Sequence, residues 1–91
     1  MKKKKDPILL AFGQKVRAIR EKAGLTQREV AKRSGLDVTY ISGLERSVRN
    51  PSLMSLEKLA KGLGCSMADT CQDLDKLDLG KRLPKKTKKK G

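Results

Sequence analysis

The sequence predicts an all-α fold, a compact domain of five short helices, and three observations support this prediction. Apolar residues recur at three- and four-residue spacing, which is the stripe of an amphipathic helix. Runs of β-branched or aromatic residues with period two, which would favour strands, are missing, and Phe12 and Tyr40 are the only aromatic residues. A chain of 91 residues has room for one small domain with an aliphatic core.

The first helix is expected to begin at Asp6 and Pro7. An acceptor side chain at the N-cap precedes a proline at the first helical position, where its missing N–H costs nothing. Gly24 is expected to end this helix. Its apolar stripe consists of Leu9, Phe12, Val16, Ile19 and Ala23.

The second helix is expected to start after Thr26. Glu29 lies three residues further on and completes the capping-box pattern. Val30 and Ala31 form its apolar face, and Gly35 ends it.

Three further N-cap candidates predict the remaining helices. Asp37 can cap a third helix whose inward positions are Ile41 and Leu44. After the break at Pro51, Ser52 can cap a fourth helix, with its apolar residues at Leu53, Leu56, Leu59, Ala60 and Leu63. Ser66 and Asp69 resemble a second capping box that opens a short fifth helix, with Met67, Cys71 and Leu74 inside.

Positive charge is concentrated at the two ends of the chain. The formal net charge is +13, and four lysines lie in residues 1–5 and seven basic residues in residues 81–91. We therefore expect a central domain, residues 6–80, between two disordered basic tails, residues 1–5 and 81–91. Either the tails attract a polyanion such as nucleic acid, or they are a solubility device or a remnant unrelated to function.

Several classes of function find no support in the residues. The chain has no histidine, and Cys65 and Cys71 match no metal or redox spacing, so we expect no metal, no cofactor and no catalytic residue. Both thiols are interpreted as small core residues in a reducing compartment. No apolar run approaches the ~20 residues that span a membrane. We expect a cytoplasmic protein that is not an enzyme, with no predicted small-molecule ligand.

The segment between the second and third helices indicates a sharp corner. Where two helices cross at about 90–120° with a short connection, the residue four before the turn must be small, and Ala31 occupies that position. Gly35 can adopt positive φ at the corner. Ile41 and Leu44 then pin the third helix to the core, and its outer face is expected to carry Val38, Thr39, Ser42, Gly43 and Arg46.

The run GLTQREVAKRSGLDVTYISGLER, Gly24 to Arg46, resembles the helix-turn-helix domain of the phage repressor and Cro type, also called the xenobiotic-response-element family. The resemblance extends over residues 6–74, with the motif at residues 26–46. It implies that the helix near residues 37–47 lies in the major groove of double-stranded DNA. It also implies a structural ion pair between Arg20 and Glu45, which would tie the reading helix to the first helix.

The resemblance assigns expected roles to individual side chains. Thr39 and Ser42 can bond base edges, and Val38 can pack on a thymine methyl group. Arg46 can bind a guanine or a phosphate. Residues of the motif and the loop after it are expected to contact DNA, mostly at phosphates: Gln27, Arg28, Tyr40, Arg49 and Asn50.

Gly43 and Val38 depart from the family pattern, because many members carry a long polar side chain at both positions. Two interpretations of Gly43 stay open. Either it lets the backbone approach DNA closely, or it fits a crowded contact within the domain. Sequence preference then leans more on DNA shape than on direct contacts.

The leading hypothesis is a sequence-specific transcriptional regulator that binds a palindromic operator as a homodimer, because one helix reads only a few base pairs. The fifth helix and the end of the fourth are the expected dimer surface. Residues Asp37 to Asn50 look like those of restriction-modification controller proteins. Two alternatives are a protein-binding adaptor with the same fold and a non-specific nucleic-acid binder driven by its lysine tails.

Overall fold

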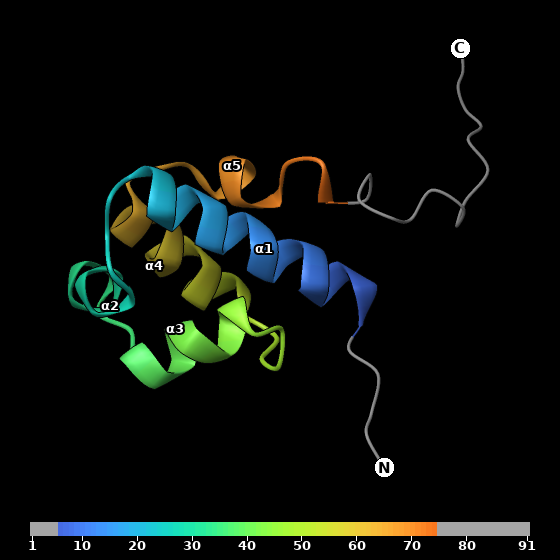
Figure 1. Cartoon of the computed structure of the whole chain (residues 1–91), viewed down its shortest axis with the longest axis horizontal. Coiled ribbons are helices and arrows are strands. Elements are labelled where there is room, and N and C mark those ends of the chain that lie inside the picture. The colour runs from blue at the N-terminus through green and yellow to red at the C-terminus, as the bar shows by residue number, and fades with distance from the viewer. Residues whose placement is uncertain (1–5, 75–91) are drawn as a thin grey trace.

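Five helices, in the predicted order, make up residues 6–74, the part of the chain that this computed structural model describes. They are α1 (Pro7–Lys22), α2 (Gln27–Ser34), α3 (Val38–Glu45), α4 (Leu53–Leu63) and α5 (Met67–Cys71) (Figure 1). The all-α prediction is confirmed for this range. Both predicted tails, together with residues 75–80, lie outside the described residues.

Side-chain caps begin four of these helices where the sequence predicted them. Asp6, Thr26, Ser52 and Ser66 each accept an N–H of the first turn, and Thr26 and Ser66 form full capping boxes. The prediction for Asp37 was only half right. It occupies the N-cap position of α3, but its side chain forms no cap hydrogen bond. The first turn of α3 closes instead through the Asp37 carbonyl, which accepts from the N–H groups of Tyr40 and Ile41 at 3.0 and 3.1 Å.

The core is aliphatic apart from one phenylalanine, as the composition indicated. Its buried members come from α1 to α4 and from the last described residue: Ala11, Phe12, Val16, Val30, Ala31, Ile41, Leu44, Leu59, Leu63 and Leu74. All four long helices therefore contribute an apolar face to one shared interior.

Three predicted core positions were wrong, and all three lie at helix ends. Ala23, the C-cap of α1, and Leu53, the first residue of α4, are both exposed. Cys71 is also exposed. Thr70 takes its place in the interior, and its hydroxyl donates to the Met67 carbonyl at 2.6 Å, which makes the burial of a polar group possible.

The helices are arranged around α1, which runs through the middle of the molecule (Figure 1). It packs against α3 and α5, which lie on opposite sides of it in this view. α2 packs against both α3 and α4, and α4 also contacts α5. This arrangement leaves α3 along one edge of the molecule, with one long side turned away from α1.

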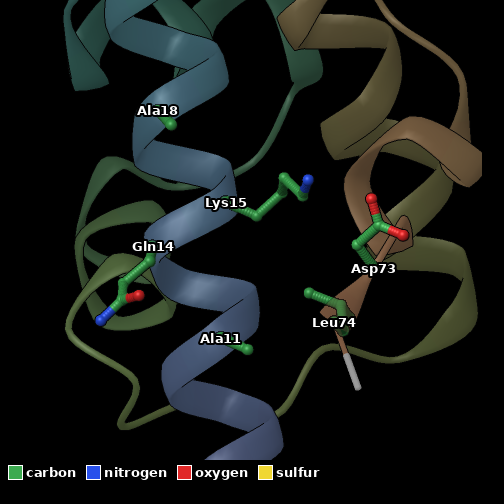
Figure 2. A pocket seen from close by; sticks show the side chains of 6 residues that line it. All are labelled: Ala11, Gln14, Lys15, Ala18, Asp73 and Leu74. Carbon is green, nitrogen blue, oxygen red and sulfur yellow. The ribbon is translucent and has the colours of Figure 1, made fainter. Parts of the chain in front are cut away.

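Surface hollows on the described residues are shallow. One, of about 240 Å³, lies between α1 and the last described residues and is lined by Ala11, Gln14, Lys15, Ala18, Asp73 and Leu74. Figure 2 shows the Lys15 side chain reaching from α1 toward the segment that carries Asp73 and Leu74. Within residues 6–74, no helix has the length and apolar character needed to cross a membrane. No group of three or more metal-ligating side chains gathers in the same range.

Candidate nucleic-acid interface

The corner between α2 and α3 contains the small buried alanine and the glycine with positive φ that the sequence predicted. Gly35 ends α2 in the left-handed region, with φ 78° and ψ 10°, and its N–H donates to the Ala31 carbonyl at 2.9 Å. Ala31 is buried, with 8% of its surface exposed. The Ser34 hydroxyl accepts from the N–H of Leu36 at 3.1 Å and holds the connection in place. Only residues 35–37 separate the two helices, so α3 leaves the corner in a defined direction.

One face of α3 packs against the core. Ile41 is 0% exposed and Leu44 is 1% exposed. Because residues three and four apart share a helix face, these two side chains fix the rotation of α3 about its own axis. The opposite face carries Thr39 and Arg46, which are both exposed.

A buried polar network joins α3 to α1 and α2. Arg20 Nε donates to Glu45 Oε2 at 2.7 Å, and Arg20 Nη2 donates to Glu45 Oε1 at 3.0 Å, so the expected ion pair is bidentate. The Gln27 side-chain amide donates to the same Oε1 at 3.0 Å. Arg20 Nη1 also donates to the Leu25 carbonyl at 2.9 Å. Only 13% of the Arg20 side chain and 4% of the Glu45 side chain are exposed.

The contact with Glu45 stabilises the charged form of Arg20. Its hydrogen bond with Glu45 raises the pKa of the guanidinium above its ordinary value, and this effect outweighs burial, which acts in the opposite direction. A charged, bidentate pair has a planar geometry that restricts both side chains. The network therefore holds the C-terminal end of α3 at a set position relative to α1.

Sequence reasoning missed the bond between Gln27 and Glu45. The two residues are 18 positions apart, so no helical spacing rule connects them. An amide nitrogen carries two N–H groups, and only one of them is needed for Glu45. The second can donate to a group outside the protein.

The predicted outer face of α3 is only partly an outer face. Thr39 and Arg46 are exposed and Ser42 is half-buried, and Arg46 Nε donates to Ser42 Oγ at 3.3 Å. Val38 is half-buried and packs against the core. Gly43 is buried, so its predicted exposure was wrong.

The side chain of Arg49 covers Gly43. A Cβ atom placed on Gly43 would lie 2.6 Å from Arg49 Cγ, which is closer than real Cβ contacts. The guanidinium carbon of Arg49 lies 5.8 Å from the centre of the Tyr40 ring. Of the two open interpretations of Gly43, the structure favours the crowded contact within the domain.

The remaining predicted contact residues lie on α2, on α3 itself and in the loop after α3. Arg28 on α2 and Arg49 and Asn50 in the loop after α3 are exposed, whereas Gln27 and Tyr40 are half-buried. The surface thus combines a protruding helix of eight residues, hydroxyl groups that can donate or accept, and flanking arginines. Such a helix fits the major groove of B-DNA, which is about 12 Å wide.

The sequence is similar to those of known helix-turn-helix proteins. The model of the helix-turn-helix family matches residues 16–69 of the chain. Control protein C.MunI from Mycoplasma sp is 40% identical over 72 residues, which is 78% of this chain and 97% of that protein.

Solved structures of similar proteins have the same fold. The restriction-modification controller protein C.AhdI from Aeromonas hydrophila superposes with a TM-score of 0.66 at 42% identity, over 68% of this chain and 94% of that chain. C.Esp1396I bound to a 19 base pair DNA duplex superposes with a TM-score of 0.68 at 40% identity. That alignment covers 76% of this chain and 92% of that chain.

Proposed function

Because the chain belongs to the helix-turn-helix family of DNA-binding transcriptional regulators, we propose that it reads a palindromic operator as a dimer, with α3 in the major groove. The observation that supports this proposal most directly is the fixed position of α3 in the domain. Ile41 and Leu44 anchor one face of the helix in the core, and Glu45 ties its end to Arg20. The opposite face is left for a ligand.

Base recognition is proposed for four side chains in α3 or at its C-cap. Thr39 and Ser42 can donate to or accept from base edges, and the exposed part of Val38 can pack on a thymine methyl group. Arg46 takes a guanine or a phosphate.

Phosphate contacts are proposed for the rim of the same surface, because they position the domain without reading sequence. The second N–H of the Gln27 amide is already oriented by the bond to Glu45. The other proposed phosphate contacts are Arg28, Tyr40, Arg49 and Asn50.

Dimerisation is proposed through α4 and α5. The sequence pointed to the end of α4, whereas the structure favours its start. Leu59, Ala60 and Leu63 are buried in the chain's own core, so the end of α4 offers no free apolar surface. By contrast, Leu53 and Met54 are 73% and 70% exposed. Together with Glu57 and Met67 of α5 they line a shallow hollow. Exposed apolar side chains that adjoin one another, as around this hollow, mark a candidate contact surface.

The similarity to control proteins supports a narrower role. We propose that the chain regulates the operon of a restriction-modification system from the cytoplasm, where the DNA lies, and that it performs no catalysis itself.

The test is a selection of bound duplexes from a random DNA pool at about 150 mM salt, where exposed charges are already screened beyond about 8 Å. The expected result is a two-fold symmetric site with half-sites about one helical turn apart. Binding without any enriched sequence would contradict the proposal.

That contrary outcome would favour one of two other functions. A protein-binding adaptor is supported by two positions of α3 that offer no hydrogen-bonding side chain to bases: Gly43, which is buried, and Val38, which is half-buried. A non-specific binder would instead lose all DNA binding when residues 1–5 and 81–91 are deleted. For the proposed regulator, the same deletion reduces affinity and salt dependence but leaves the preferred site unchanged.

A further inference from the structure

We propose that Gly43 positions Arg49 for DNA binding, and that it does so without touching DNA itself. The inference rests on the proposed function, because it assigns a use to Arg49 at the surface around α3. Gly43 has no side chain beyond a hydrogen atom, and the sequence alone predicted it on the outer face of α3.

The loop after α3 folds back onto the helix at Gly43. The N–H of Val48 donates to the Gly43 carbonyl at 2.9 Å, which brings the following residue, Arg49, against the same helix. Arg49 Cγ would lie 2.6 Å from a Cβ on Gly43, and Arg49 Nε and Cβ would lie at 3.6 and 3.7 Å. The aliphatic stem of Arg49 therefore lies in the space that any other residue at position 43 would fill.

Tyr40 holds the other end of the same side chain. It precedes Gly43 by three residues, so the two share a face of α3. The Arg49 guanidinium lies 5.8 Å from the centre of the Tyr40 ring, within the range of a cation–π attraction. Tyr40 is itself packed against the core, so it is a fixed support.

The charge of Arg49 remains available for a ligand. The side chain is exposed, and within residues 6–74 its guanidinium forms no ion pair. A guanidinium presents a rigid fork of donors that matches a phosphate, and it loses less conformational freedom on binding when it is already oriented. Gly43 thus contributes to affinity by reducing the number of conformations of Arg49 in the free protein.

The fold itself tolerates a methyl group at this position. The three atoms nearest to a Cβ on Gly43 belong to the Arg49 side chain, and the one that would clash, Cγ, moves away when that side chain rotates about χ1. Alanine is also a better helix former than glycine. Gly43→Ala should therefore remove the positioning without unfolding the domain.

The experiment compares full-length wild type, Gly43→Ala, Arg49→Ala and the double variant on the selected operator duplex. Dissociation constants are measured at several salt concentrations, and melting temperatures are measured without DNA. We expect Gly43→Ala to melt at or above the wild-type temperature and to bind roughly three- to tenfold more weakly. The double variant should bind no more weakly than Arg49→Ala, which itself should lower the salt slope by about one.

Arg46→Ala supplies the matched control, because it removes another exposed arginine of this region that does not cover Gly43. In that background Gly43→Ala should keep its full effect. Equal operator affinity of Gly43→Ala and wild type would overturn the inference while leaving the proposed function intact. A loss that persists undiminished in the Arg49→Ala background would also overturn it, since the methyl group would then meet DNA directly. A wild type that binds no duplex would overturn both proposals.

Discussion

Glu45 links the C-terminal end of α3 to α1 and α2. Its carboxylate is almost inaccessible to water and instead accepts three N–H donors, two from Arg20 and one from Gln27. A buried charge is tolerated only when such partners replace its hydration. Removal of Arg20 alone would leave a buried charge without its main partner. It should therefore lower the free energy of unfolding more than replacement of both Arg20 and Glu45 by apolar residues would.

Replacement of Arg20 by methionine should lower the free energy of unfolding by about 3 kcal/mol, because Glu45 would keep only the Gln27 amide as a side-chain partner. Urea denaturation followed by circular dichroism measures this. Arg17→Met is the matched control on the same helix. It removes a pair with Glu21 whose side chains are 64% and 55% exposed, and it should cost less than about 1 kcal/mol. Equal losses of unfolding free energy in the two variants would show that burial does not strengthen the contribution of the pair between Arg20 and Glu45 to stability.

At the level of whole elements, α5 shows how a helix of five residues is maintained. Ser66 Oγ accepts the N–H of Asp69, and Asp69 Oδ2 accepts the N–H of Ser66, both at 3.0 Å. The hydrogen bonds to the backbone and side chain of Ser66 lower the pKa of Asp69 below its ordinary value of 3.8. The carboxylate form of Asp69 therefore stabilises the folded state.

The stabilising effect of Asp69 should depend on pH in one direction. Since its pKa is lower in the folded than in the unfolded chain, the effect is present above the unfolded pKa and is lost as pH falls through the folded pKa. Melting temperatures of wild type and Asp69→Asn, compared from about pH 6 down to about pH 2.5, should differ most at the upper end. A difference that stays constant over this range would rule out the assignment.

The crossing of α2 and α4 depends on Gly62. A Cβ there would lie 2.7 Å from Ser34 Cβ and 3.0 Å from both the Ser34 nitrogen and the Val30 carbonyl oxygen. These atoms belong to or adjoin the backbone of α2, so they cannot rotate away as the stem of Arg49 can.

Gly62→Ala should consequently lower the free energy of unfolding by about 1–3 kcal/mol, although alanine is the better helix former. Thermal unfolding beside Gly43→Ala gives a direct comparison, because the two variants make the same chemical change in helices. We expect Gly62→Ala to lower the melting temperature and Gly43→Ala to keep or raise it. Stabilisation by Gly62→Ala would mean that α2 and α4 can separate without cost.

On the scale of the whole molecule, the exposed apolar side chains of α4 set the expected assembly. Leu53 and Met54 adjoin Met67 of α5 around one hollow, and at 73% and 70% they are the most exposed large apolar side chains within residues 6–74. A second copy of the chain would remove this surface from water and would pair two α3 helices for a two-fold site.

Met54→Glu should shift the chain from dimer to monomer, because it would place a carboxylate in the proposed contact. Sedimentation velocity across a concentration series measures the shift, and operator affinity should fall with it. Ile8→Glu is the control, since Ile8 is 46% exposed at the start of α1, away from this hollow. A dimer that survives Met54→Glu would require a different contact surface.

Helix boundaries could be predicted from the sequence because the signals that set them are local. Ser66 and Asp69 are three residues apart, and the capping box needs nothing further. Gly35 likewise ends α2 with a positive φ because of its own missing Cβ. The pair of Arg20 and Glu45 was accessible only through resemblance to a family, since no local rule relates residues 25 positions apart.

Tertiary structure alone decided which parts of each helix are covered and which distant side chains meet. The stripe of α4 correctly included Leu59, but it could not show that Leu53 is exposed. Gln27 reaches Glu45, and Arg49 covers Gly43, only because the corner at Gly35 and the loop after α3 return the chain upon itself. Periodicity tells which residues share a face. What lies opposite that face depends on how the helices cross, which is a property of the packed core as a whole.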